Sequence, residues 1–310
     1  MPKIFSLKVL IWLTLALIWS TTWIFIKIGL GDLPPIAFSS ARFLLSAVIL
    51  FAIVSVKKIP LPKAAKHWRL IGLTGILQFS LNYSAVFWAE QHITSGLAAV
   101  LQSMIPVFGL VVAWFFLPEE KINAQKIAAV ALGVVGVAVI FIDQLRVENW
   151  LAFAGCVAVV VGAYAAAQSS VLVKAKATGM NPASLVLCQM LCGLPGIIAY
   201  SLMSEGNPLH YNWSLKAVWC VAYLAVFGSV IAFWLYYWLL SQIESTKAMM
   251  ISLVTPFLAV VIGAVTYGET LPAQTFFGGL LIIGSIALIV FKKKTSNAKT
   301  QSGEDAKITA

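Results

Sequence analysis

The chain of 310 residues has a composition that excludes most soluble proteins. Apolar residues make up 61% of it and charged residues only 10%, against about 45–50% and about 25% in typical soluble domains. A soluble enzyme, a nucleic-acid-binding module and a disordered regulatory chain are therefore excluded. The formal net charge of +10 does not indicate nucleic-acid binding, because the distribution of the charges along the chain has a different explanation.

The apolar residues fall into ten runs, each long enough to cross a bilayer as an α-helix. Backbone N–H and C=O groups find no water in hydrocarbon, so spans of this length must be helical. A β-barrel would instead show alternating segments of about ten residues, and the sequence has none. In chain order the expected spans are 10–26, 36–56, 70–89, 97–117, 127–142, 151–173, 183–203, 217–240, 248–267 and 276–291.

The positive charges support a definite orientation. With the N-terminus in the cytoplasm, 17 of the 21 Lys and Arg residues lie on the cytoplasmic side, and only Lys27, Arg146 and Lys216 lie outside. This asymmetry follows the positive-inside rule for an even number of spans. We therefore expect an all-α protein of the inner (plasma) membrane with both termini cytoplasmic. The polar residues 295–310 are expected to form a disordered cytoplasmic tail.

The two halves of the chain repeat one pattern. An offset of 150 residues pairs Pro106 with Pro256 and Glu119 with Glu269. Each half holds five spans, and because five is odd the two copies must have opposite orientations, as in many transporters. The expected domains are a first repeat at 1–146, a second, inverted repeat at 147–294 and the tail at 295–310.

Several local motifs carry a family resemblance. The first span contains the run from Leu17 to Ser20 (LIWS), the second begins with the run from Pro34 to Phe38 (PPIAF), and Arg42 precedes a phenylalanine. A glutamate follows each of the two paired prolines after thirteen residues. In these features the sequence resembles the drug/metabolite transporter superfamily, of the EamA type. The resemblance implies a ten-helix carrier that works by alternating access through a central cavity between its halves, and it names no substrate.

Pro106 and Pro256 lie near the middle of the fourth and ninth spans. A proline removes one helical hydrogen bond and clashes with the carbonyl four residues earlier, so we expect kinks that free the carbonyls of Gln102 and Ser252. Interrupted helices at corresponding positions of two repeats point to a transporter's binding site. They are equally compatible with structural kinks whose freed groups bond to neighbouring side chains.

Polar side chains inside the spans suggest where a solute binds. Gln78 and Asn82 are four residues apart on one helix face, and Tyr164 and Gln168 have the same spacing. Unpaired amides are costly in lipid, so these residues should face the interior of the bundle, although hydrogen bonds between helices would also account for them. The predicted substrate-binding residues are Trp19, Gln78, Asn82, Gln102, Tyr164, Gln168, Tyr237 and Trp238.

Arg42 is the one clear formal charge inside a span, and its partner at an offset of 147 is the neutral Gln189. It could extend to the external face, pair with Glu90 or Asp32, or reach the cavity. In the last case a carboxylate-bearing solute is favoured, because Arg binds carboxylates through paired hydrogen bonds.

The acidic residues avoid the centres of the spans. Proton-coupled carriers commonly use buried carboxylates or histidines, so transport is either uncoupled or coupled through a residue at a span end. Glutamates that cap helices or fix loops are the alternative. The candidate charge or coupling residues are Arg42, Glu90, Glu119, Glu244 and Glu269.

The sequence therefore predicts a membrane carrier that exports small metabolites, amino acids or similar amphiphilic solutes. A passive channel and a lipid-carrier flippase are the alternatives. An intramembrane enzyme is not expected, because the spans contain no nucleophile–base pair, no HExxH motif and no histidine. The expected partners are a small-molecule solute and the lipid bilayer, without nucleic acid, metal or cofactor, and the chain is expected to be a monomer or a homodimer.

Overall fold

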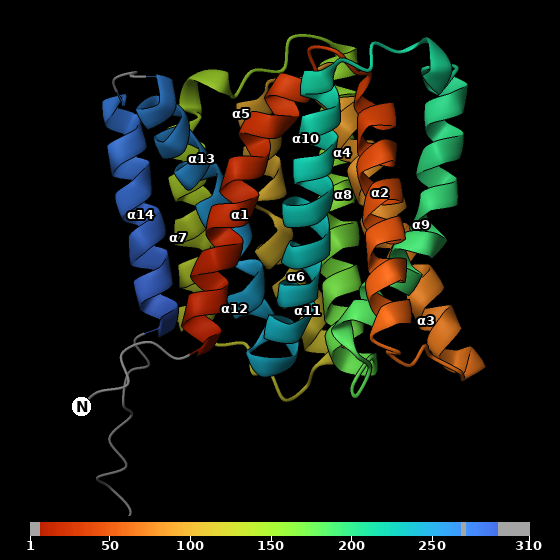
Figure 1. The fold of residues 1–310 in the computed structure, drawn as a ribbon. Helices are drawn as coiled ribbons and strands as arrows, with labels where there is room; N and C mark the ends of the chain where they lie inside the picture. The colour runs from red at the N-terminus through yellow and green to blue at the C-terminus, as the bar shows by residue number, and fades with distance from the viewer. Residues whose placement is uncertain (1–6, 268–270, 291–310) are drawn as a thin grey trace, which may run out of the picture.

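The structure, a computed structural model, describes residues 7–267 and 271–290. Within these residues the chain forms ten helical spans that stand side by side (Figure 1). Eight of them are long and apolar enough to cross a membrane, and two shorter apolar helices complete the set. The expected all-α membrane fold with ten helices is confirmed.

The first half contains five spans, of which the third and fourth are interrupted. The helices are α1 (Leu7–Gly29), α2 (Pro35–Val56), α3 (Ala65–Gly75), the π-helical segment η1 (Ile76–Asn82), α4 (Tyr83–Ala89), α5 (Ser95–Gln102), α6 (Ile105–Phe116) and α7 (Ala124–Ile140). A short 3-10 turn, η2 (Ile142–Gln144), follows the fifth span. The third span thus consists of α3, η1 and α4, and the fourth consists of α5 and α6.

The second half repeats this arrangement. Its helices are α8 (Trp150–Lys176), α9 (Pro182–Ser204), the 3-10 turn η3 (Pro208–His210), α10 (Leu215–Ala225), the π-helical segment η4 (Val226–Ile231), α11 (Ala232–Gln242), α12 (Ser245–Met249), α13 (Ile251–Tyr267) and α14 (Ala273–Val290). An offset of 150 residues carries the start of η1 onto the start of η4 and Ser95 onto Ser245, where α5 and α12 begin. The third and eighth spans therefore share a π-helical segment, and the fourth and ninth share a break.

Close packing between α7 and α14 places the fifth and tenth spans together at one side of the bundle (Figure 1). A Cβ atom added to Gly136 would lie 2.8 Å from the carbonyl oxygen of Gly278, and one added to Gly278 would lie 2.5 Å from that of Gly136. The two backbones therefore touch, which is how small residues promote helix association in membranes. Gly193 of α9 makes a similar approach to Gly75 at the end of α3.

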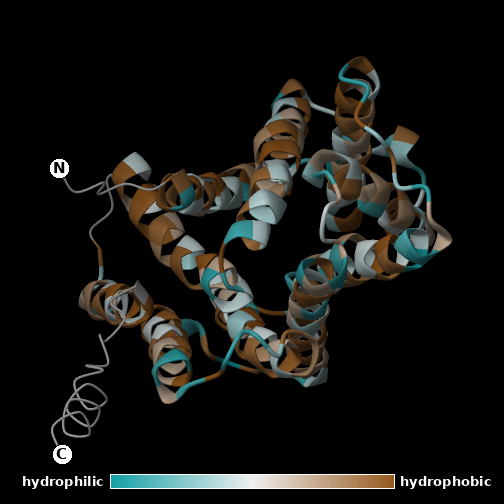
Figure 2. Cartoon of the chain, turned by 90° about the horizontal axis from the view of Figure 1, so that it is seen from below, coloured by the Kyte–Doolittle hydropathy of each residue, from teal (hydrophilic) through white to brown (hydrophobic). Residues whose placement is uncertain are grey.

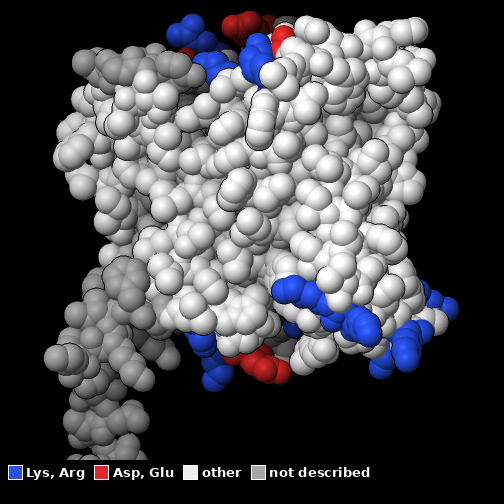
Figure 3. Space-filling view, in the orientation of Figure 1, with Lys and Arg blue, Asp and Glu red and all other residues white. Residues whose placement is uncertain are grey.

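The outer surface is apolar between two charged ends. Figure 3 shows a broad uncharged belt, with Lys and Arg gathered along the edge from which α1 and α3 begin. Seen along the helix axes, the spans form a ring, and hydrophobic residues predominate along the helices (Figure 2). Trp114, Phe115 and Trp219 are each about two-thirds exposed, and such exposure of large aromatic side chains would be unfavourable in water but is suited to lipid.

A candidate solute cavity between the two halves

A cavity of about 200 Å³ lies inside the ring and is lined by both halves of the chain. Its aromatic wall consists of Trp19, Trp23, Tyr83, Phe87, Phe233 and Tyr236. Its polar groups include Arg42, Gln78, Asn82, Glu90, Gln102, Ser170, Ser252 and Thr255. A mostly apolar cavity with a few convergent polar groups is the usual form of a small-molecule site.

The central cavity continues into a second cavity of about 610 Å³. The two share five lining residues, Trp23, Ile26, Glu90, Ala99 and Pro256. Lys27 at the end of α1, Ser95 at the start of α5 and Gln144 after α7 line only the second one. The combined cavity therefore extends toward the end opposite the start of α1, which is the external side in the orientation that the charges predict.

The π-helical segment η1 carries two of the predicted amides into the cavity. Gln78 and Asn82 are both more than 90% buried and both line it. The Asn82 Oδ1 atom accepts a hydrogen bond from Gln102 Nε2 at 3.3 Å, which connects the third and fourth spans. Gln78 has no side-chain hydrogen-bond partner among the described residues, so its amide is available to a solute or to water.

Arg42 also lines the cavity, although only 3% of it is exposed. Its Nε atom donates to Ser229 Oγ at 2.8 Å, and its Nη2 atom donates to the Gly228 carbonyl at 2.9 Å. Its Cζ atom lies 5.2 Å from the ring centroid of Phe43 and 5.5 Å from that of Tyr83. The guanidinium therefore stays within the bundle instead of extending to the external face.

Asp32, a predicted partner of Arg42, is engaged elsewhere. It accepts a hydrogen bond from Ser214 at 2.6 Å and pairs with Lys216 at 3.1 Å, and these hydrogen bonds lower the pKa of the Asp32 carboxyl. No carboxylate of the described residues forms an ion pair with Arg42. Of the predicted environments for Arg42, the one that the structure shows is the cavity.

The fourth and ninth spans are interrupted, but not at the prolines themselves. α5 ends at Gln102 and α6 begins at Ile105, so Pro106 lies in the first turn of the new helix, where its missing N–H costs little. Pro256 lies inside α13 and lines the cavity, and the break precedes it at Met250. The Ser252 carbonyl, which Pro256 frees, accepts the Thr255 hydroxyl at 3.5 Å.

Two predicted residues of the sixth span do not line the cavity. Tyr164 is 47% exposed and packs against the ring of Phe108, and Gln168 is only partly buried. Ala166 and Ser170 of α8 line the cavity instead. α8 carries small or apolar side chains around most of its circumference, so its few polar residues could not reveal which face turns inward.

In the eighth span the cavity-lining residues are Phe233 and Tyr236, and the predicted Tyr237 and Trp238 do not line it. The physical reason is η4. A π-helical turn holds more residues than an α-helical turn, so it rotates the following face of α11 relative to a regular helix with 3.6 residues per turn. The Tyr237 hydroxyl is buried and has no hydrogen-bond partner among the described residues.

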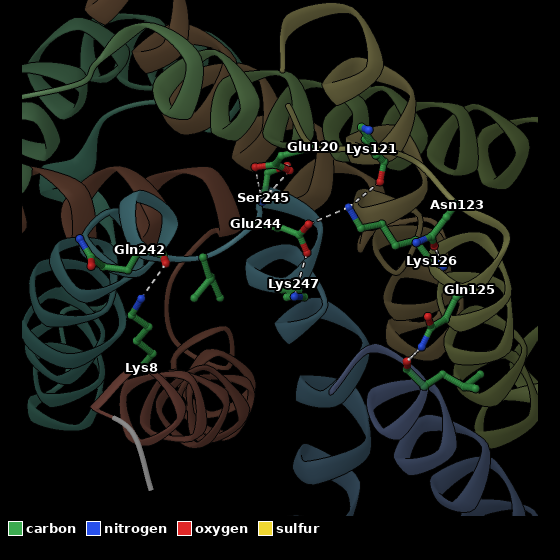
Figure 4. A network of polar contacts seen from close by, with 12 residues as sticks. Lys8, Glu120, Lys121, Asn123, Gln125, Lys126, Gln242, Glu244, Ser245 and Lys247 are labelled. Carbon is green, nitrogen blue, oxygen red and sulfur yellow. Dashed lines mark hydrogen bonds and ion pairs between the residues drawn. The ribbon is translucent and has the colours of Figure 1, made fainter. Parts of the chain in front are cut away.

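Figure 4 shows a polar network at the end where α1 begins, formed around Glu120 and Glu244. Glu120, buried in the connection from α6 to α7, accepts hydrogen bonds from Ser245 N and Oγ and pairs with Lys174 at 3.3 Å. Its neighbour Glu119, the predicted candidate, is exposed. Sequence reasoning missed Glu120, because nothing in two consecutive loop glutamates shows which one turns inward.

Glu244 belongs to the same network. It forms ion pairs with Lys126 at 3.0 Å and Lys247 at 2.9 Å. Burial raises the pKa of its carboxyl, but hydrogen bonds from both lysines outweigh this, so the pKa lies below its ordinary value. Glu244 is therefore ionised and paired at neutral pH. Glu269, the last of the predicted carboxylates, lies outside the described residues.

The short helix α12 separates this network from the cavity. Its first residue, Ser245, is bound by Glu120, and its residues Ala248 and Met249 line the cavity. The network therefore fixes the helix that forms the cavity floor. Glu90 lies at the other end of the cavity, just after α4, and its carboxyl has no ion-pair or side-chain hydrogen-bond partner among the described residues. Burial raises the pKa of Glu90 to about 7.

Residues 6–142 and residues 153–291 each match the EamA-like transporter family. The chain belongs to this family. As an EamA-like transporter it carries two copies of the family domain in one multi-pass membrane chain, and it is not an enzyme.

This EamA-like transporter is similar, over nearly its whole length, to proteins that are named as transporters or as an efflux pump. It is 27% identical to "Uncharacterized transporter YoaV" of Bacillus subtilis, covering 90% of this chain and 95% of that one. It is 27% identical to "Uncharacterized inner membrane transporter YedA" of Escherichia coli K12, covering 92% and 91%. It is 25% identical to a "Probable amino-acid metabolite efflux pump" of Salmonella typhimurium, covering 94% and 97%.

A solved crystal structure has the same fold as this EamA-like transporter. The match has a TM-score of 0.77 at 18% identity and covers 91% of this chain and 97% of the other. At this level of identity the likeness extends to the fold alone.

Proposed function

We propose that this EamA-like transporter is a carrier that exports small zwitterionic or amphiphilic metabolites, amino acids among them, by alternating access. The observation that carries the proposal is the cavity between the two halves, which extends toward one end of the bundle and is floored at the other end by α12. The name of the Salmonella relative, a probable amino-acid metabolite efflux pump, supports the same solute class.

The chemistry of the lining suits an amphiphilic solute. Aromatic side chains from α1, α4 and α11 offer broad apolar contact, and such contact is favourable for a solute with an apolar part. Gln78, Asn82 and Gln102 offer amide donors and acceptors in the same space. We propose that Trp19 and these three amides contact the solute.

The conformational change is proposed to use the irregular segments. η1, η4 and the two helix breaks lie at related positions in the two repeats and adjoin the cavity. Opening toward the cytoplasm requires α12 to move, which means breaking the contacts of Glu120 with Ser245 and Lys174. Exchange between two such states at a fixed central site is how repeat-built carriers work.

The test is efflux from proteoliposomes loaded with a pooled set of amino acids and small metabolites, with and without a pH gradient. Saturable efflux of one zwitterionic class supports the proposal. Efflux that depends on the gradient would assign coupling to an end residue, with Glu90 tested first. If nothing but lipid moves, the flippase alternative replaces the carrier.

A further inference from the structure

Arg42 carries a charge that the described part of the chain leaves without a counter-ion. The neighbours of its guanidinium are the Ser229 hydroxyl, the Gly228 carbonyl and the Tyr83 phenol, all of them neutral. A buried charge without an opposite charge is strongly disfavoured. Among intramembrane residues, such a charge at a cavity usually marks a functional site.

The fold itself does not require this charge. The corresponding position in the second repeat is Gln189, which is fully buried and donates from Nε2 to Thr74 Oγ1 at 2.6 Å. A neutral amide therefore occupies the corresponding place in the other half. What distinguishes Arg42 is the cavity, because Arg42 lines it and Gln189 does not.

The surroundings hold the guanidinium in one orientation. Gly228 lies in η4, and its carbonyl accepts from both Arg42 Nη2 and Trp19 Nε1. A Cβ atom added to Gly228 would lie 3.1 Å from Arg42 Nη2, so glycine makes room for the side chain. The bonds to Ser229 and Gly228 use two of the five N–H donors of a guanidinium, which leaves donors for a ligand that enters the cavity.

We infer that Arg42 binds the carboxylate group of the transported solute. The inference rests on the proposed function and adds a recognition element to it, namely a planar fork of donors that matches a carboxylate in geometry and charge. The same cavity also holds the unpartnered Glu90 on the external side and the Gln78 amide. A solute with a carboxylate at one end and an ammonium or polar group beyond it matches this arrangement.

The experiment compares three probes that differ only at their charged groups: L-leucine, L-leucinamide, which lacks the carboxylate charge, and 4-methylpentanoate, which lacks the ammonium. Uptake of each probe and its binding to the detergent-solubilised protein are measured. We expect leucine and 4-methylpentanoate to bind at least ~10-fold more tightly than leucinamide, as loss of one charge-assisted contact implies.

The variants are Arg42→Gln, Arg42→Lys and, as a matched control, Arg69→Gln, which removes an exposed arginine that lines neither cavity. Arg42→Gln should abolish the preference for the acid over the amide, Arg42→Lys should retain part of it, and the control should retain all of it. The ratio of acid uptake to amide uptake is the decisive quantity, because a purely structural role of Arg42 would lower the uptake of both probes alike.

The outcomes distinguish the carboxylate site at Arg42 from the proposed carrier function. If the wild-type protein moves leucine and leucinamide equally well, the carboxylate site is wrong and the carrier proposal stands. If it moves neither these probes nor any other amino acid, the proposed function fails. If Arg42→Gln does not fold, the wild-type preference and the Ser229→Ala variant, which keeps the charge but loses one positioning bond, still decide the question.

Discussion

At the scale of single residues, hydrogen bonding inside the cavity explains why amides occur within hydrophobic spans. Asn82 and Gln102 bond to each other across two spans, while Gln78 has no such partner among the described residues. The bond between Asn82 and Gln102 joins two spans of the cavity wall and leaves the Asn82 amide nitrogen and the Gln102 amide oxygen for the solute, while the whole Gln78 amide is available to it.

Replacing either member of the pair with leucine should lower transport. Asn82→Leu and Gln102→Leu each remove the bond and place methyl groups in the cavity. We expect flux to fall ~10-fold or more, because a lost hydrogen bond costs about 1.4 kcal/mol, which corresponds to a factor of ten. Insertion into the membrane should be unchanged. Tyr164→Leu, outside the cavity, is the control, and normal flux in both cavity variants would remove these amides from the site.

Glu90 gives the cavity a dependence on pH. Because its pKa is raised to about 7, Glu90 carries its proton and is neutral at pH 6, whereas it is ionised at pH 8. An ionised carboxylate near the external opening repels an anionic group and offsets the positive potential from Lys27 and Arg42, which line the same cavities. Binding of 4-methylpentanoate should therefore weaken by roughly two- to fivefold from pH 6 to pH 8.

The comparison that checks this prediction is Glu90→Gln, which should bind the probe equally at both pH values. His92 lies near the same helix end, with its ring against Trp88. His92→Gln is therefore measured in parallel. A profile that flattens in His92→Gln and persists in Glu90→Gln would assign the effect to the histidine.

At the scale of helices, close backbone contact fixes the pairing of α7 with α14. Gly136 and Gly278 face each other with no room for a side chain. In membranes such pairs associate through van der Waals contact, because lipid supplies no hydrophobic drive between helices. The pairing therefore depends on the absence of Cβ atoms at these two positions.

Gly278→Leu should destabilise the protein by about 1–3 kcal/mol, the usual cost of overpacking a well-packed contact. The measurement is thermal unfolding in detergent, with Gly72→Leu as the matched control because a Cβ atom there meets nothing within 4 Å. Equal unfolding midpoints for the two variants would show that the α7–α14 contact contributes little.

Helix faces also show how far the sequence could predict the site. The ten spans, the two repeats and the inward position of Gln78 and Asn82 follow from composition, charge and spacing. The face of α11 does not, because the π-helical turn before it has no sequence marker and shifts Tyr236 inward in place of Tyr237. Glu120 is recognisable only through its tertiary partners, Ser245 and Lys174.

At the scale of the whole molecule, the cavity and the polar network lie at opposite sides of α12, so the state described is open toward one end and held closed at the other. Lys174 and Ser245 bind Glu120 with charge-assisted bonds that are stronger than neutral ones. Weakening them should favour the state in which the floor opens.

Glu120→Gln should shift the population away from the state described. The readout is a cysteine placed at Ser170, which lines the cavity, in a background without Cys156, Cys188, Cys192 and Cys220. A membrane-impermeant thiol reagent added from outside should label it several-fold more slowly in Glu120→Gln, because the charge-assisted bonds that hold α12 in the state described are weakened. Glu119→Gln, the exposed neighbour, should label like the wild type. Identical rates in the two variants would contradict the proposal that Glu120 holds α12 in place.

The most direct test of the carrier account is exchange across the membrane of proteoliposomes. Efflux of a labelled amino acid is measured over a range of internal concentrations, with and without the unlabelled compound outside. Alternating access predicts that efflux saturates and that it accelerates when the external compound is present, since a loaded site returns faster than an empty one. Efflux that rises linearly with concentration and ignores the external compound would contradict alternating access and identify a passive channel.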